Sequence, residues 1–215
     1  MTDTMTPARF HAEVGVEDWR VLYVGPCAYF RTGSLTAGVV LVDAIVALAE
    51  AADGHPELDL RTRGVTVRLL APDADGITGA DVVLAQQISA AARELDAPAD
   101  PGAVQVVEIA IDALGPEVWP FWRAVLAYER RGPVDLVDAT GRGVSFRLQQ
   151  MDAPRPQRNR LHVDISVPHD QGRARVDAAI TAGGHLVSDR DAPSWWVLAD
   201  PEGNEACVAT WVGRD

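Results

Sequence analysis

One order of elements occurs twice in the second half of this chain: a strand, a helix and then further strands. Alternating apolar residues predict the strands, and apolar residues three or four positions apart predict the helices. The expected elements are residues 104–111, 116–129, 134–138 and 144–151, then 161–167, 171–182, 185–188, 195–199 and 205–211. The repeat predicts two βαβββ units of this kind in tandem.

The first half predicts a separate domain. Its expected elements are strands at residues 19–24, 28–32 and 64–70 and helices at residues 34–52 and 78–94. Ser34 and Thr78 suit the first position of a helix because their hydroxyls accept hydrogen bonds from backbone N–H groups. Residues 96–103 contain two prolines and a glycine without periodicity, which is typical of a linker. We therefore expect one domain at residues 8–95 and another at residues 104–213.

Composition excludes several classes of protein. A net charge of −12 argues against nucleic-acid binding, which depends on clustered Lys and Arg. The most apolar run, residues 37–49, contains Asp43 and is too short to span a bilayer, so it predicts a buried helix. The N-terminus resembles no secretory signal, and Cys27 and Cys207 lie too far apart in the chain to indicate a disulfide framework. We expect a cytoplasmic protein with no membrane or nucleic-acid partner.

Polar residues follow a regular pattern in the strand at residues 161–167. His162, Asp164 and Ser166 alternate with apolar residues, so they project from one face of the strand. Near the C-terminus, the sequence Asp-Pro-Glu-Gly-Asn at residues 200–204 predicts a turn, and the last strand then begins at Glu205. A histidine and a glutamate at the starts of two strands can hold a metal ion or transfer a proton.

These two segments resemble the glyoxalase/bleomycin-resistance (vicinal oxygen chelate) superfamily, in which a first-strand His and a last-strand Glu are metal ligands. The resemblance implies a divalent metal bound by His162 and Glu205. Because two ligands hold a metal weakly, Gln149 or Gln150 would have to add a further ligand. The alternative is a hydrogen-bonded His162 paired with Glu205 or Asp164, which could itself act as an acid–base unit.

Neighbouring residues suggest a ligand for this strand face. Only one of Trp195 and Trp196 can line the cavity, since adjacent strand residues face opposite ways, and we expect Trp196 to stack on a flat conjugated ligand. Arg158 and Arg160 precede the histidine strand, where they could hold an anionic substituent or remain solvated. The predicted substrate-binding residues are Asp164, Trp196, Arg158, Arg160 and Gln150.

The first domain resembles the pterin-4a-carbinolamine dehydratases through Trp19 and the pattern A-E-x-x-x-x-H-P-E at residues 49–57. That family uses histidines as general acid and base. The resemblance implies catalytic roles for His55 and Asp81, but Gly54 and Pro72 stand where the other two histidines occur. Neither glycine nor proline transfers protons, so we expect weak or lost dehydratase activity. As alternatives, His55 is a turn residue and Asp81 a first-turn helix acid.

The sequence therefore predicts an α+β protein of two domains: a dehydratase-like antiparallel sheet with helices on one face, then the paired βαβββ module. The leading hypothesis is a lyase or isomerase acting on a small pterin-like or aromatic metabolite in the second domain, with His162 as base or ligand and Glu205 as its partner. The alternative is a non-catalytic small-molecule binder. A third reading makes the first domain an assembly module, and we expect a homodimer.

Overall fold

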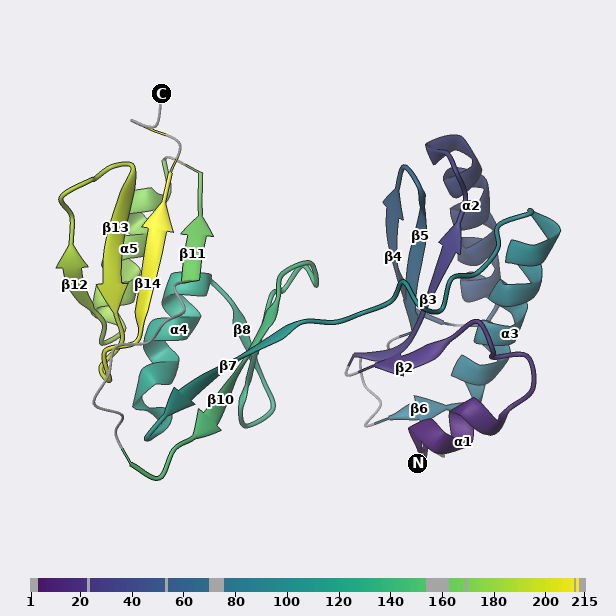
Figure 1. Cartoon of the computed structure of the whole chain (residues 1–215), viewed down its shortest axis with the longest axis horizontal. Coiled ribbons are helices and arrows are strands. Elements are labelled where there is room, and N and C mark those ends of the chain that lie inside the picture. The colour runs from purple at the N-terminus through teal and green to yellow at the C-terminus, as the bar shows by residue number, and fades with distance from the viewer. Residues whose placement is uncertain are drawn as a thin grey trace. The chain divides into compact units, whose positions relative to one another are not determined.

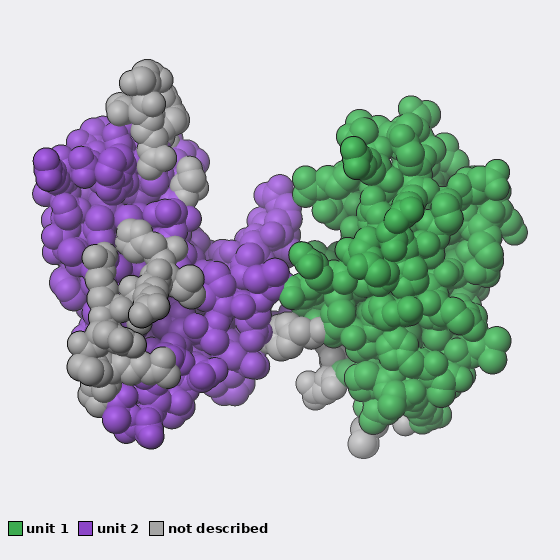
Figure 2. Space-filling model, viewed as in Figure 1, with its two compact units in different colours: residues 1–106 green, residues 107–215 purple. Residues whose placement is uncertain are grey.

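The computed structural model describes residues 4–22, 24–52, 54–69, 76–153, 163–168, 170–210 and 212. It divides into two compact units, Met1–Val106 and Val107–Asp215 (Figure 2). Each unit has its own apolar core. Within the described part of the chain, no helix is both long and apolar enough to cross a membrane.

Unit 1 is an antiparallel sheet with helices on one face (Figure 1). The sheet has the order β2-β3-β5-β4, and a short pair, β1 and β6, lies outside it. The strands are β1 (Thr4–Met5), β2 (Arg20–Leu22), β3 (Gly25–Arg31), β4 (Pro56–Arg61), β5 (Gly64–Leu69) and β6 (Ile77–Thr78). The helices are α1 (Pro7–Ala12), α2 (Leu35–Ala51) and α3 (Gly79–Glu94).

Both long helices of unit 1 begin as the sequence predicts. The Ser34 hydroxyl accepts a hydrogen bond from Ala37 N at 3.1 Å, so Ser34 is the N-cap of α2. Thr78 caps α3 in the same way, through Asp81 N. These caps satisfy backbone N–H groups that have no partner inside the helix.

Residues 96–103, expected to be a linker, lie against unit 1 instead. Arg31 N donates to Pro98 O at 2.9 Å, and Asp100 N donates to Tyr29 O at 2.8 Å. Ala97 is buried in the core of this unit, and the Arg31 guanidinium pairs with the Asp100 carboxylate. On one edge of β3, strand β2 pairs only with residues 25–27. The segment 96–103 covers the rest of that edge through an antiparallel bridge between Ala99 and Phe30, and so it extends the sheet.

Unit 2 consists of two βαβββ modules, each with a four-stranded mixed sheet and one main helix (Figure 1). Module 1 contains β7 (Glu108–Ala113), η1 (Pro116–Val118), α4 (Trp119–Leu126), β8 (Glu129–Arg131), β9 (Asp135–Val137) and β10 (Ser145–Gln150). Module 2 contains β11 (Val163–Ser166), α5 (Gly172–Thr181), β12 (His185–Ser188), β13 (Trp195–Ala199) and β14 (Glu205–Ala209). The sheets have the orders β7-β10-β9-β8 and β11-β14-β13-β12. The predicted pairing of two such units is confirmed.

One predicted boundary in module 1 is wrong. The helix expected to run to Glu129 ends at Leu126, because Ala127 adopts a left-handed conformation with φ 57°. Strand β8 then begins at Glu129. Its three residues are all charged and exposed, so no alternation of apolar side chains indicated a strand.

Each sheet of unit 2 has a core face and an open face. The core face packs on α4 and α5 and carries Ile109, Phe146, Leu198 and Val208 among others. We call the opposite side the open face. In the pairs of neighbouring strands, facing residues project to the same side, so the register of the sheets assigns every strand residue to one face.

Candidate functional site

The open face of the second sheet brings together residues from three strands. Asp164 of β11 pairs with Cys207 of β14, and Cys207 pairs with Val197 of β13. Glu205 and Trp195 lie on the same face, because each is two residues from a member of this row. Glu205 and Trp195 are half-buried and Asp164 is exposed. Asp164 and Glu205, which are both predicted site residues, therefore lie on one face of this sheet.

Three predicted site residues lie outside the described residues: His162, Arg158 and Arg160. The pairing of His162 with Glu205 thus stays a prediction. The described register adjoins it, because Val163 pairs with Ala206 in the parallel pair β11–β14.

Trp196 lies on the core face, whereas we expected it to contact a ligand. It is 7% exposed and belongs to the apolar cluster of unit 2. A Cβ on Gly172 would lie 3.2 Å from the Trp196 ring, so the ring rests against the first residue of α5. This placement favours a packing role for Trp196. The tryptophan on the Glu205 face is Trp195.

Gln150 also takes a structural role. Gln149 and Gln150 point to opposite faces at the end of β10, and Gln150 lies on the core side with Leu148 and Phe146. Its amide Nε2 donates to Leu114 O at 2.6 Å and to Met151 O at 3.0 Å. Among the described residues, no group of three His, Cys, Asp or Glu side chains forms a metal site. Gln150 therefore lies on the core side, whereas Gln149, the other expected ligand, lies on the open face with Arg147. Because His162 lies outside the described residues, the expected metal site stays a prediction.

The open face of the first sheet carries a cluster that the sequence did not predict. Arg147 Nη1 lies 3.4 Å from Glu108 Oε1, and Arg147 Nε lies 3.6 Å from Asp135 Oδ1. Glu108 Oε2 and Asp135 Oδ1 are buried and accept no hydrogen bond from the described residues. A buried carboxylate oxygen without a hydrogen bond is energetically unfavourable, so these two oxygens favour a ligand that donates hydrogen bonds.

The register of the first sheet fixes the face of Glu108. Glu108 pairs with Ser145 and shares the open face with Arg147. A shift of one residue would reverse the face of every side chain in the strand, so this placement depends on the pairing of β7 with β10.

The turn before Glu205 is held by a buried aspartate. Asp200 is fully buried, and its Oδ1 accepts hydrogen bonds from Glu202 N at 2.9 Å and Asn204 N at 2.8 Å. Its Oδ2 accepts from Asn204 Nδ2 at 2.8 Å and from Trp122 Nε1 at 2.9 Å. The turn that the sequence predicted at residues 200–204 is therefore built around one carboxylate.

In unit 1, the residues expected to be catalytic lie on α3 and directly before β4. Asp81 Oδ2 accepts hydrogen bonds from Thr78 N and Thr78 Oγ1, both at 2.8 Å, in the capping box of α3. His55 is exposed and directly precedes β4. A Cβ on Gly54 would lie 2.8 Å from Leu84 Cδ2, so Leu84 fills the space beside the missing histidine. Pro72 lies outside the described residues. The arrangement supports the helix-acid reading of Asp81.

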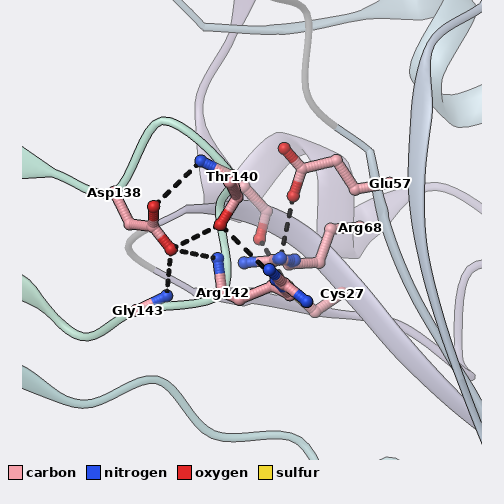
Figure 3. A network of polar contacts seen from close by, with 8 residues as sticks. Cys27, Glu57, Arg68, Asp138, Thr140, Arg142 and Gly143 are labelled. Atoms are coloured by element: carbon pink, nitrogen blue, oxygen red, sulfur yellow. Dashed lines mark hydrogen bonds and ion pairs between the residues drawn. The ribbon is translucent and has the colours of Figure 1, made fainter. Parts of the chain in front are cut away.

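The open face of the unit 1 sheet carries a buried thiol beside an ion pair. Arg68 Nη2 lies 2.8 Å from Glu57 Oε2, and both residues pair with their neighbours in the row that contains Cys27 (Figure 3). Burial raises the pKa of Cys27 to about 11, with a smaller contribution from the Glu57 charge, although Arg68 opposes the shift. At neutral pH the thiol is protonated, and it is a poor nucleophile.

Comparison with known proteins defines both halves of the chain. Residues 3–91 match the family model of pterin 4 alpha carbinolamine dehydratase, and residues 108–209 match that of a glyoxalase-like domain. A protein of Mycobacterium leprae that is named a pterin-4-alpha-carbinolamine dehydratase is 33% identical over 88 residues, which are 41% of this chain and 90% of that protein. The chain belongs to this dehydratase family through its first domain. Its second domain is glyoxalase-like.

Two further similarities are to another dehydratase and to a glyoxalase-related enzyme. A Nocardia farcinica protein with the same dehydratase name is 45% identical over 60 residues, 28% of this chain, and the chain spans only 63% of its length. A glyoxalase-related enzyme from Fulvimarina pelagi has 17% identity and a TM-score of 0.38, over 51% of this chain and 88% of that one. The two family models show that the chain fuses a dehydratase-like domain with a glyoxalase-like domain.

The glyoxalase-like domain contains a second aspartate turn, between β9 and β10 (Figure 3). Asp138 Oδ2 accepts hydrogen bonds from Thr140 Oγ1 at 2.7 Å, Gly143 N at 2.8 Å and Arg142 N at 3.2 Å, while Oδ1 accepts from Thr140 N at 3.0 Å. These bonds, of which those from Thr140 matter most, lower the pKa of Asp138 from 3.8 to about 2.

We expect Asp138 to affect acid stability modestly. Because its folded pKa is lowered, its contribution to stability is complete above the unfolded pKa of 3.8 and is lost as the pH falls through about 2. The carboxylate is largely exposed, so solvent screening keeps the effect small. Circular dichroism of Asp138→Asn should show a flatter loss of stability with acid than the wild-type chain over that interval. Identical acid profiles would contradict the assignment.

Proposed function

We propose that the glyoxalase-like domain holds the ligand site of this chain, on the open face of its second sheet. The observation that supports it is the placement of Glu205 and Asp164 on one face with Trp195, opposite the apolar core. Trp195 pairs with Ala209, whereas Glu205 pairs with Ala199, so the ring and this carboxylate lie at opposite ends of the strand pair, with Asp164 in the row between them. An elongated, polar compound with a flat ring suits this arrangement. The Trp195 ring offers a stacking surface, and the carboxylates accept hydrogen bonds or protons.

In this proposal, Glu205 and His162 form the proton-transferring pair of a lyase or isomerase. Val163 and Ala206, the residues that follow His162 and Glu205 in the chain, face each other in the sheet, which supports such a pair. A histidine beside a carboxylate exchanges protons near neutral pH.

The described charges favour a ligand rich in hydrogen-bond donors. Among the described residues, the open faces of the two sheets carry the acids Glu108, Asp112, Glu129, Asp135, Asp164 and Glu205, against the cations Arg131 and Arg147. We therefore propose an aromatic or pterin-like compound with amino or amidinium groups. An anionic substituent would have to be held by Arg158 and Arg160, which lie outside the described residues.

Two probes of similar size and opposite charge test the proposal. Benzamidine and benzoate share a flat ring, and one carries an amidinium where the other carries a carboxylate. We expect benzamidine to quench Trp fluorescence of the full chain and benzoate to bind far more weakly. Glu205→Gln should weaken benzamidine binding roughly tenfold to a hundredfold, the usual contribution of a hydrogen bond to a charged group.

Glu117→Gln is the matched control, because it removes the same charge from an exposed position in η1. It should leave benzamidine binding unchanged. If wild-type fluorescence and melting temperature respond to neither probe, the proposed ligand site is wrong. A screen of pterins and aromatic compounds then tests for catalysis. If benzamidine binds but none of the compounds that bind in this screen is converted to a product, the chain is a non-catalytic binder, which is the second candidate function. In the first domain, the capping role of Asp81 favours binding without catalysis, because Thr78 already occupies the carboxylate.

A further inference from the structure

The turn between β13 and β14 belongs to module 2, yet module 1 holds it. The Glu202 carboxylate accepts hydrogen bonds from Leu114 N at 2.9 Å, through both oxygens, and from Gly115 N at 3.2 Å. The Asp200 carboxylate accepts from the indole Nε1 of Trp122 in α4. Trp122 and Asp200 are almost completely buried, so water does not compete for this bond.

Module 1 gains a helix cap from this contact. Its helical segment begins at Pro116 and continues into α4, and the N-cap position is Gly115, which has no side chain with which to accept a hydrogen bond. The backbone N–H groups at a helix start need acceptors, and a negative charge there is favourable. Glu202, from the other module, supplies an acceptor for Gly115 N, and its negative charge adds to that of Glu117 in the first turn.

Module 2 gains a fixed start for β14. Asp200 binds Glu202 N, Asn204 N and Asn204 Nδ2, so the turn is closed up to the residue before Glu205. The corresponding turn of module 1 differs. The hydrogen bonds that Asp138 accepts come from residues 140–143 of its own turn.

We propose that Asp200 and Glu202 are positioning residues for Glu205. They clamp the turn to Leu114, Gly115 and Trp122, and they thereby set where β14 and its first side chain lie relative to module 1. The role of Glu205 in binding rests on the proposed function, whereas the clamp itself does not. Any ligand that contacts both open faces would require this fixed relation.

Residual dipolar couplings test the clamp without a ligand. In the full chain, the amide couplings of β14 and α4 report the angle between these elements. Glu202→Ala should change that angle and lower the melting temperature of unit 2 by about 4–8 °C, as loss of a helix cap typically does in a domain of this size. Glu202→Gln keeps an acceptor oxygen and should retain the wild-type couplings.

Glu129→Ala, at an exposed position of β8, is the control and should leave the couplings unchanged. Trp122→Phe removes the indole N–H and serves as the second variant if Glu202→Ala does not fold. If either variant melts earlier while the β14–α4 couplings match the wild type, the residues only stabilise the fold and the proposal is overturned. If the couplings change and benzamidine binds neither protein, the clamp stands and the proposed ligand site fails.

Discussion

Dehydration of a 4a-hydroxytetrahydropterin by this chain should be at least ~100-fold slower than by a relative with all three histidines, because general acid–base groups contribute about 10²–10⁴-fold. Gly54 and Pro72 stand where two of those histidines are expected. Asp81 Oδ2 accepts two hydrogen bonds from Thr78 in the capping box of α3, which gives Asp81 a structural role. A stopped-flow assay at neutral pH measures the rate directly.

Restoring the histidines requires space as well as chemistry. A side chain at residue 54 would begin 2.8 Å from Leu84 Cδ2, so Leu84 must move to admit an imidazole. We expect Gly54→His with Pro72→His to gain little activity, and the same pair with Leu84→Ala to gain more. Leu84→Ala alone is the control, and it should remain inactive. Near-normal turnover of the wild-type chain would contradict the loss of dehydratase function.

Asp200→Ala should destabilise the glyoxalase-like domain by about 3–5 kcal/mol, since it leaves several buried donors without an acceptor. The donors are the indole N–H of Trp122, the Asn204 amide and two backbone N–H groups. Urea unfolding followed by near-ultraviolet circular dichroism measures the loss.

Asp138→Ala is the matched control for this change. Asp138 accepts as many hydrogen bonds in its own turn, but it lies at the surface, where water can replace them. Its loss should cost below about 1.5 kcal/mol. Equal destabilisation by the two substitutions would show that burial of Asp200 and its bond to Trp122 do not matter.

The sequence predicts features that depend on local chemistry. Ser34 and Thr78 begin helices because their hydroxyls bind nearby backbone groups, and the turn at residues 200–204 follows from its Asp, Pro and Gly residues. The tandem order of strands and helices follows from apolar periodicity. These signals span a few residues, so they can be read without knowledge of the folded chain.

Features that depend on contacts between distant residues were missed or misassigned. The choice between Trp195 and Trp196 depends on which face α5 covers, and no local pattern indicates it. The Glu108–Arg147–Asp135 cluster arises because three strands align side chains that lie up to 39 residues apart in the chain. Residues 96–103 bind β3 through backbone atoms, which their sequence does not reveal.

Chemical-shift mapping with benzamidine tests the central claim that the glyoxalase-like domain carries the ligand site. With the full chain labelled with ¹⁵N, benzamidine should shift the backbone signals of Asp164, Glu205 and Cys207 and the indole signal of Trp195. Signals from residues 3–91 should stay in place. Shifts confined to residues 3–91, with β11, β13 and β14 unaffected, would contradict the account.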